Sequence, residues 1–403
     1  MPRPLHVAQI SFFNDPAGRT PATLLEAWPT LGEVAEAACA AGVRVSVVQA
    51  SVHTETLTRN GVQYHFLPFG DASVSNEGAG RLAALLHGMA PELFHVHGLA
   101  FPSHVLALAQ RAPGIPIVLQ DHADRPPRIW RRALWRRAMA RAAAITFCAP
   151  EQASPFRSAG LIGAGVPCYA IPESTSRFTP GDAEQARQLT GLGGDPALLW
   201  VGHLDANKDP LTILAGASAA ARALPRLQLW CCFGTAPLGK EVRRRIAQDP
   251  MLTDRVHLLG NVSHGQVEQL MRAADIFVQG SHHESTGYSV IEALACGLTP
   301  VITDIPSFRA LTGGGAVGSL WPPGDTAAYA AALSSIGARA RPALRAEARA
   351  HFERELSFPA LGSKLAAMYE SLCERNGETH GLEAWMPHDT RTGASSGEAS
   401  CRL

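Results

Sequence analysis

The sequence predicts an α/β protein made of two similar, doubly wound parallel-sheet domains joined by one linker. Its 403 residues fit two domains of ordinary size. A hydrophobic content of 46% with 17% charged residues is typical of a chain that buries a large core. Short apolar runs alternate with Ala-, Leu- and Arg-rich helical stretches, which is the pattern of strand–helix–strand units. The formal charge of zero excludes a bulk attraction to nucleic acid.

The first half contains apolar runs of strand length separated by helical stretches, and this predicts a first domain over residues 1–172. Its first long helix is expected over Leu24–Ala41, where Gly42 ends the apolar periodicity. The expected strands are Leu5–Phe13, Val43–Gln49, Tyr64–Leu67, Leu93–Val96, Ile117–Gln120, Ala144–Cys148 and Val166–Ile171.

Breakers and turn formers interrupt this rhythm and predict a linker over residues 173–196, with a short helix at Ala183–Leu189. A second domain is expected over 197–345, and helices over 346–375 are expected to return toward the first domain. Residues 376–403 mix Gly, Ser, Thr and charge, which predicts a disordered tail. The expected strands of the second domain are Ala197–Val201, Leu227–Phe233, Val256–Leu259, Ile276–Gln279 and Pro300–Thr303, with helices beginning near Pro210, Pro237, His264, Thr286 and Asp325.

Location and metal content are predicted from what the chain lacks. No stretch reaches the roughly 18 consecutive apolar residues of a membrane span, and the N-terminus lacks the pattern of a signal peptide. The 8 cysteines are scattered without a C-x-x-C pair, and several lie in apolar runs. This indicates reduced core thiols in a cytoplasmic protein and makes a metal cluster improbable.

A first chemical motif follows the strand that ends at Val201. Gly202 allows close backbone approach, and the loop delivers Lys208 just before a helix that begins at Pro210. A lysine at a helix N-terminus after a strand is well placed for a phosphate, because its ammonium adds to the free amides and the helix dipole. The alternative is a surface loop with an exposed lysine and Asp209 as the helix cap.

The second motif is the stretch from Gly280 to Gly297. A strand ends in a small-residue loop, and the amides of Ser285, Thr286, Gly287 and Tyr288 would form an anion site at the start of a helix. Glu284 precedes that helix and Glu292 lies about two turns inside it, so both can line one wall of a cleft. Carboxylates suit sugar and ribose hydroxyls. The alternative is a polar capping loop followed by an exposed helical glutamate.

These motifs resemble those of the retaining glycosyltransferases of family 4. Glu284 and Glu292 stand in an E-x7-E arrangement, followed by Ala-Leu-Ala-Cys-Gly-Leu-Thr-Pro. The Val-Gly-x-Leu-Asp-x-x-Lys-Asp-Pro stretch is similar to the diphosphate-binding loop of that family, and Ile171–Pro180 resembles its interdomain linker. The resemblance covers roughly residues 5–375 and implies the GT-B fold, in which two Rossmann-like domains face each other across a cleft.

The resemblance implies roles for these residues. Lys208 would hold the nucleotide diphosphate, Glu292 the ribose hydroxyls, and Glu284 with the backbone of the following loop the donor sugar and phosphates. The family usually carries an arginine where this chain has His203. A neutral histidine donates one hydrogen bond and no full charge. Either His203 is cationic near the diphosphate, or another arginine serves, or donor binding is weak.

The first half carries fainter signals. Leu93-Phe-His-Val-His97-Gly resembles a conserved segment of the family, and His122 follows the next strand. The resemblance implies that His122 approaches the reaction centre and that His97 lies on the acceptor side; the alternative is a histidine that bonds a neighbouring carbonyl. A Gly-Gly pair common near the N-terminus of the family is absent, and Gly18 and Arg19 are the residues that stand in that region.

Residues 125–141 hold seven arginines and two tryptophans. Such a stretch can touch an anionic membrane surface. Trp135 and Met139 fall among arginines on a helical projection, which favours the alternative of a solvated basic helix.

Taken with the resemblance, the sequence predicts a cytoplasmic transferase that moves a sugar from a UDP- or GDP-sugar to an acceptor, with retention and without a metal or other cofactor. The acceptor is a sugar, a lipid-linked molecule or a small molecule, and no nucleic acid is involved. Two alternatives remain: a nucleotide-sugar epimerase or sugar-phosphate-accepting synthase on the same fold, and a nucleotide-sugar-binding protein without catalysis.

Overall fold

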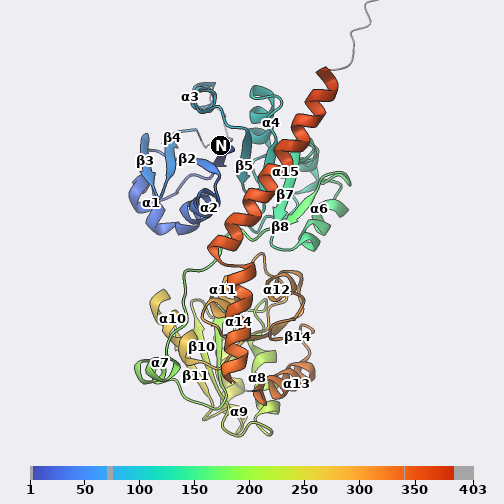
Figure 1. Cartoon of the computed structure of the whole chain (residues 1–403). Coiled ribbons are helices and arrows are strands. Elements are labelled where there is room, and N and C mark those ends of the chain that lie inside the picture. The colour runs from blue at the N-terminus through green and yellow to red at the C-terminus, as the bar shows by residue number, and fades with distance from the viewer. Residues whose placement is uncertain (1–2, 70–75, 340, 385–403) are drawn as a thin grey trace, which may run out of the picture.

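The computed structural model describes residues 3–69, 76–339 and 341–384. It contains two lobes, each built on one parallel sheet with helices on both faces (Figure 1). The N-lobe sheet has the strand order β3-β4-β2-β1-β5-β6-β7-β8, and only β3 runs antiparallel to its neighbour. The C-lobe sheet has the order β11-β10-β9-β12-β13-β14 and is parallel throughout. The predicted α/β class and the two doubly wound sheets are confirmed.

The N-lobe strands follow the apolar runs of the first half closely. They are β1 (His6–Ser11), β2 (Arg44–Ala50), β3 (Glu55–Arg59), β4 (Val62–Leu67), β5 (Leu93–His97), β6 (Ile117–Gln120), β7 (Ala142–Phe147) and β8 (Cys168–Ala170). The helices are α1 (Pro21–Ala27), α2 (Pro29–Ala40), α3 (Asn76–Met89), α4 (Pro102–Arg111), α5 (Arg132–Met139) and α6 (Ser154–Ser158), with short 3-10 helices at Ile129–Arg131 and Pro150–Ala153.

The C-lobe begins with α7, which packs on α10, and its strands again match the predicted runs to within one or two residues. The strands are β9 (Ala197–Gly202), β10 (Gln228–Phe233), β11 (Val256–Gly260), β12 (Ile276–Gln279), β13 (Thr299–Thr303) and β14 (Ser319–Trp321). The helices are α7 (Ala183–Thr190), α8 (Pro210–Ala220), α9 (Gly239–Gln248), α10 (His264–Ala273), α11 (Tyr288–Ala295), α12 (Pro306–Thr312), α13 (Thr326–Gly337), α14 (Arg341–Glu355) and α15 (Phe358–Ala384).

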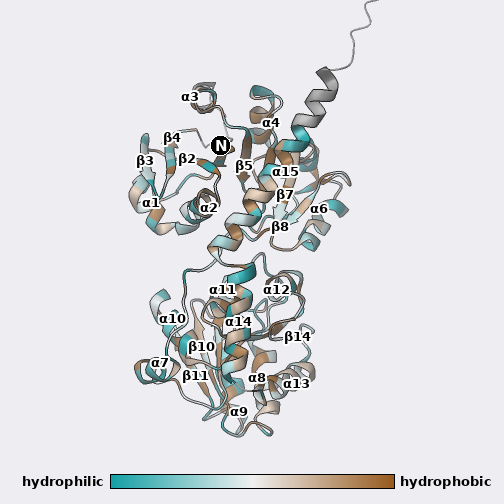
Figure 2. Ribbon diagram, viewed as in Figure 1, coloured by the Kyte–Doolittle hydropathy of each residue, from teal (hydrophilic) through white to brown (hydrophobic). Residues whose placement is uncertain are grey.

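Each sheet is buried on both faces. Along β1, Val7 joins one hydrophobic cluster while Ala8 and Ile10 join another, because successive side chains of a strand point to opposite faces. In the C-lobe, Phe277 and Val278 divide in the same way between two clusters. In Figure 2, strands such as β5 of the N-lobe are coloured as hydrophobic, whereas helices such as α10 of the C-lobe carry hydrophilic residues. Burial on both faces explains why these strands read as continuous apolar runs.

Two expected helices need correction, and two edge strands were missed. The single helix expected over Leu24–Ala41 is two, α1 and α2, because Pro29 has no amide hydrogen to donate and Trp28 has non-helical backbone angles. The helix expected near Thr286 begins at Tyr288, since Gly287 takes the left-handed conformation as its cap. The edge strands β3 and β14 were not predicted at all; both are short and only partly buried.

The chain returns to the N-lobe after α14. This helix packs on α11 of the C-lobe, whereas α15 packs on α2 of the N-lobe and contributes Leu365 and Tyr369 to the N-lobe core. Figure 1 shows the two helices end to end across the junction of the lobes. Helix α15 runs through residue 384, so the start of the stretch expected to be a disordered tail is helical. Once a helix has formed and is packed against the protein, each added turn needs no new nucleation, because every further residue that is fixed adds one backbone hydrogen bond.

Candidate functional site

Two cavities, each of about 420 Å³, lie where the loops that follow the strands of the two lobes come together. This is the position at which ligands bind to folds of this kind. Glu173, in the segment between the lobes, lines both cavities. The N-lobe pocket is lined by Ser11, Phe13, Trp28, Thr30, Leu31, Gln49, His97, Gly98, Ala100, Phe101, His122, Asp124 and Glu173. The C-lobe pocket is lined by Glu173, Val201, Gly202, His203, Lys208, Glu284, Ser285, Thr286, Gly287, Tyr288, Ser289 and Glu292.

All eight residues predicted to bind the donor line the C-lobe pocket, and so does Glu284. Lys208 Nζ lies 2.5 Å from Glu284 Oε1. Both side chains are about 15% exposed, at 16% and 14%. The lysine is therefore not the solvated surface residue of the alternative interpretation. It is a nearly buried cation, held by one carboxylate.

Asn207 joins the two loops that carry this pair. Its side chain donates to the carbonyl oxygen of His283 over 3.0 Å and accepts from the His283 amide over 3.1 Å. Its own carbonyl accepts from the amide of His282 over 2.8 Å. Sequence reasoning did not single out Asn207. The signal was its place between two predicted site loops, and only the fold shows that these loops touch.

The loop before α11 presents its amides to the pocket. Gln152 of the N-lobe donates to the carbonyl oxygens of Glu284 and Ser285, over 2.9 and 2.6 Å. Gly287 has a φ of +88°, and a Cβ there would collide with Phe308. Within the described part of the chain, no acceptor binds the amides of Ser285 to Tyr288. Free amide donors at a helix start suit an anion, and the anion site itself stays a prediction.

Glu292 is not the exposed helical residue of the alternative interpretation. Its side chain is 16% exposed, and Oε1 lies 2.6 Å from His264 Nε2. Burial raises the pKa of Glu292, and the hydrogen bond from His264 opposes that rise. The pocket is thus lined by a carboxylate that has one oxygen already oriented by a neighbour.

His203 lines the same pocket as an exposed residue. Its Nδ1 accepts a hydrogen bond from the Thr235 amide over 3.2 Å. The neutral ring therefore carries its proton on Nε2. His203 connects two loops of the lobe and contributes one donor to the pocket.

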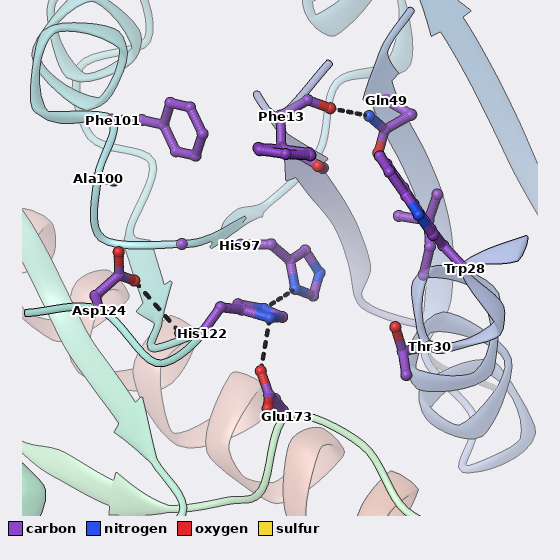
Figure 3. A pocket seen from close by; sticks show the side chains of 13 residues that line it. Phe13, Trp28, Thr30, Gln49, His97, Ala100, Phe101, His122, Asp124 and Glu173 are labelled. Atoms are coloured by element: carbon purple, nitrogen blue, oxygen red, sulfur yellow. Dashed lines mark hydrogen bonds and ion pairs between the residues drawn. The ribbon is translucent and has the colours of Figure 1, made fainter. Parts of the chain in front are cut away.

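The N-lobe pocket brings His97 and His122 together, as Figure 3 shows. His97 Nδ1 lies 3.2 Å from His122 Nε2, and His122 Nδ1 lies 2.7 Å from Glu173 Oε2. Glu173 was predicted only as a linker residue. Its signal in the sequence was an acidic residue directly after a strand and a proline, at the junction of the domains.

A buried hydrogen-bonded chain continues behind His97. Gln9 lies 3.4 Å from His97 and 3.3 Å from the hydroxyl of Tyr369, which in turn is 2.6 Å from His95 Nδ1. Burial lowers the pKa of His97 well below its ordinary value and that of His95 to about 3. Both rings are therefore neutral near pH 7. Tyr369 comes from α15, so the returning helix supports the floor of the pocket.

Gly18 and Arg19 line neither pocket. Arg19 pairs with Asp15 at 2.7 Å, and the Gly18 carbonyl oxygen lies 3.1 Å from His53 Nε2. The two residues form a turn after β1, and their acceptor-side role stays a prediction.

In the arginine-rich stretch, residues 125–141, the apolar and basic side chains of the helix are more clearly separated than the helical projection indicated. Trp135 and Met139 are buried in the N-lobe core, so the arginines of α5 occupy the opposite side. The preceding 3-10 turn exposes 76% of Ile129 and 73% of Trp130, with the Arg128 guanidinium 5.3 Å from the centre of the Trp130 ring.

The described residues contain neither a metal-binding cluster nor a membrane-spanning helix. No group of three or more His, Cys, Asp or Glu side chains there could hold a metal ion. None of the helices there is both long enough and apolar enough to span a membrane.

The fold and the paired pockets define the class as a GT-B protein. Solved structures of that class align over nearly the whole chain. A glycosyltransferase from Rickettsia africae has a TM-score of 0.65 at 14% identity, covering 92% of this chain and 98% of the other. HepE from Anabaena, solved in complex with UDP and glucose, has a TM-score of 0.60 at 17% identity, covering 91% and 99%.

Two family models match separate regions. "Glycosyltransferase Family 4" matches residues 30–163, and "Glycosyl transferases group 1" matches residues 195–338. The chain belongs to the group 1, family 4 glycosyltransferases, and the predicted resemblance and fold are confirmed.

Curated relatives match over part of the chain. D-inositol 3-phosphate glycosyltransferase of Geodermatophilus obscurus is 34% identical over 49% of this chain and 45% of its own length. GDP-mannose:cellobiosyl-diphosphopolyprenol alpha-mannosyltransferase of Xanthomonas oryzae pv. oryzae is 26% identical over 54% and 57%. The chain thus spans about half the length of the curated relatives it matches.

Proposed function

We propose that this protein is a glycosyltransferase that moves a sugar from a UDP- or GDP-sugar to an acceptor, with retention of configuration and without a metal. The observation that carries the proposal is the C-lobe pocket, where Lys208, the free amides of residues 285–288 and two carboxylates converge. Membership of the family supports the same conclusion. The named donors of relatives, GDP-mannose and the UDP and glucose bound to HepE, support a nucleotide sugar.

The geometry divides the work between the two members of the ion pair. A diphosphate entering the pocket meets the ammonium of Lys208 and the amides at the start of α11, and both neutralise charge that grows as the bond to the sugar breaks. When the diphosphate replaces Glu284 as the ion-pair partner of Lys208, the Glu284 carboxylate can accept hydrogen bonds from sugar hydroxyls. Glu292, deeper in the pocket, suits the ribose hydroxyls.

The N-lobe pocket is where the acceptor binds in this proposal. Aromatic rings of Phe13, Trp28 and Phe101 lie beside Asp124 and Glu173, and its lining residues include neither arginine nor lysine. Such a lining favours a neutral hydroxyl compound, a sugar above all, and disfavours a phosphorylated acceptor such as those named for the inositol 3-phosphate relatives. The synthase alternative therefore receives no support from the pocket.

The exposed turn at Ile129 and Trp130, flanked by arginines, fits contact with an anionic lipid surface at the cytoplasmic face of a membrane. The solvated basic helix remains the alternative. Co-sedimentation with vesicles of phosphatidylglycerol and phosphatidylcholine separates the two. A double change Ile129→Ser with Trp130→Ser should abolish binding to the anionic vesicles if the turn inserts, and should leave it unchanged if arginines bind without insertion.

Thermal unfolding with UDP, GDP, ADP and their sugar conjugates, with and without EDTA, tests the central proposal. A ligand at 100 times its dissociation constant adds about 2.7 kcal/mol of stability. We expect one nucleotide family to stabilise the protein, with no effect of EDTA. No response to any of them would refute the donor site, and a response without product in acceptor screens would favour the non-catalytic binding protein.

A further inference from the structure

One carboxylate contacts both pockets. Glu173 follows β8 in the segment between the lobes, and its side chain is 12% exposed. Oε2 lies 2.7 Å from His122 Nδ1 of the N-lobe. Oε1 accepts the hydroxyl hydrogen of Thr286, in the loop before α11, over 3.1 Å. The two oxygens of one side chain thus contact the reaction-side histidine and the loop predicted to hold the donor.

Tyr288, at the start of α11, is a neighbour of the same carboxylate. Burial and the nearby Glu173 raise the pKa of its hydroxyl, so the tyrosine is protonated near pH 7. Both oxygens of Glu173 thus have a potential donor, Thr286 at Oε1 and His122 at Oε2, which suits an acceptor-only carboxylate.

The carboxylate fixes the position of a proton on His122. An ionised carboxylate at 2.7 Å from Nδ1 can only accept, so Nδ1 must carry hydrogen. Nε2, the other nitrogen, then faces His97 Nδ1 at 3.2 Å. Only one proton fits between these two nitrogens. Without a partner on Nδ1, a neutral imidazole is free to move its proton to Nε2 and to turn its ring.

We propose that Glu173 is a positioning residue of the proposed transferase, which holds His122 with its proton on Nδ1 and ties that ring to the donor loop through Thr286. The inference rests on the proposed function for its catalytic meaning. With the proton of His122 on Nδ1, its Nε2 faces Nδ1 of His97. Both rings line the proposed acceptor pocket. Loop and ring are then aligned by the same side chain.

The first test reads the proton directly. Nitrogen-15 NMR of the histidine rings, in protein labelled at histidine, distinguishes protonated from unprotonated Nδ1, and the His122 signals are assigned by their loss in His122→Gln. We expect a protonated Nδ1 in the wild-type protein, an unprotonated Nδ1 in Glu173→Ala, and restoration in Glu173→Gln, whose amide oxygen can still accept. Thr286→Val is the matched control, because it removes the bond to the other oxygen and should leave Nδ1 protonated.

An unprotonated Nδ1 in the wild-type protein, or the same His122 signals in Glu173→Ala as in wild type, would overturn the inference. Unfolding temperatures of all variants are measured alongside. If Glu173→Ala does not fold, the comparison of Glu173→Gln with Glu173→Leu replaces it. These signals need no substrate, so a failure of the proposed transfer would leave this readout intact and remain distinguishable from a failure of the inference.

The second test uses turnover. Glu173→Ala should lower kcat at least tenfold while the dissociation constant for the nucleoside diphosphate changes less than threefold, since Lys208 and the loop amides remain. A loss of nucleotide binding with unchanged kcat would overturn the role through His122, because Glu173 would then act on the donor loop alone.

Discussion

The two pockets are built from different kinds of side chain, although Glu173 lines both. The C-lobe pocket presents charged groups: the nearly buried Lys208, the start of α11, and the carboxylates of Glu284 before that helix and Glu292 within it. The N-lobe pocket uses rings and a chain of hydrogen bonds that ends in a neutral buried histidine. A diphosphate leaving group needs the first arrangement and a neutral acceptor hydroxyl needs the second.

The difference also appears in what holds each pocket together. The C-lobe loops are joined by backbone and side-chain bonds of Asn207, within one lobe. The floor of the N-lobe pocket depends on Tyr369, from a helix that arrives only after the chain has completed the C-lobe. The Lys208 and Glu284 loops are therefore joined within the C-lobe, with Gln152 of the N-lobe adding bonds to the Glu284 loop, whereas the floor of the N-lobe pocket needs a helix that follows the whole C-lobe.

Removing the Lys208 ammonium should have the largest effect on the C-lobe pocket. Lys208→Ala leaves Glu284 without its partner at the position where the diphosphate would bind. Loss of one charged group at a developing charge typically costs roughly 3–4 kcal/mol, so turnover should fall about 10²–10³-fold, and free nucleoside diphosphate should bind more weakly too. Titration calorimetry and initial rates measure both. Lys240→Ala, an exposed lysine of α9, is the control, and equal losses there would refute a specific role.

Removing the anion should separate binding from transfer. Glu284→Gln relieves the competition for Lys208, so we expect nucleoside diphosphate to bind at least as tightly as in wild type. Transfer should fall about 10-fold to 10²-fold, because an amide replaces one charge-assisted bond to the sugar. The same calorimetry and rate assay apply. Turnover that stays intact with the correct donor would show that Glu284 does not contact the sugar.

The two pockets differ in how far the sequence predicted them. The donor residues lie in two contiguous stretches after β9 and β12, neighbouring strands of one parallel sheet. Both stretches follow predicted strands, whose carboxyl ends share an edge in a parallel sheet, and their resemblance to family motifs predicted that Lys208, Glu284 and Glu292 lie in one site. The pairing of Lys208 with Glu284 was not predictable, since it depends on side-chain reach.

The acceptor side needed tertiary information. His97 and His122 were found because they end neighbouring strands, but Glu173 stands about fifty residues further along the chain, in a segment read as a linker. Tyr369 is further still and belongs to α15. No local pattern connects such residues. Gly18 and Arg19 were named from the region of the family's Gly-Gly pair; they do not line this pocket, and their acceptor-side role stays a prediction.

Acid should weaken the N-lobe, because buried His95 must take up a proton when the lobe unfolds. The pKa of buried His95 is lowered to about 3 from 6.5. Between these values the unfolded chain binds a proton that the folded chain does not, so stability is full above pH 6.5 and falls as the pH drops toward 3. The slope from one such group is about 1.4 kcal/mol per pH unit. Denaturant unfolding from pH 7 to 5 should be flatter for His95→Gln than for wild type, whereas exposed His283→Gln should match wild type.

The smallest expected effect concerns His203, where the family usually has arginine. His203→Arg adds a full charge beside the diphosphate, but at an exposed site where salt screens it, and it removes the acceptor for the Thr235 amide. We expect a net gain of about 0.5–1 kcal/mol in donor binding, a change of roughly two- to fivefold that shrinks as salt is raised. His203→Gln, which keeps an acceptor without a charge, should bind the donor as wild type does. Weaker donor binding by His203→Arg would show that the hydrogen bond between His203 and Thr235 matters more for this loop than an added charge. Lys208 would then be the side chain whose positive charge binds the diphosphate, with no such role for position 203.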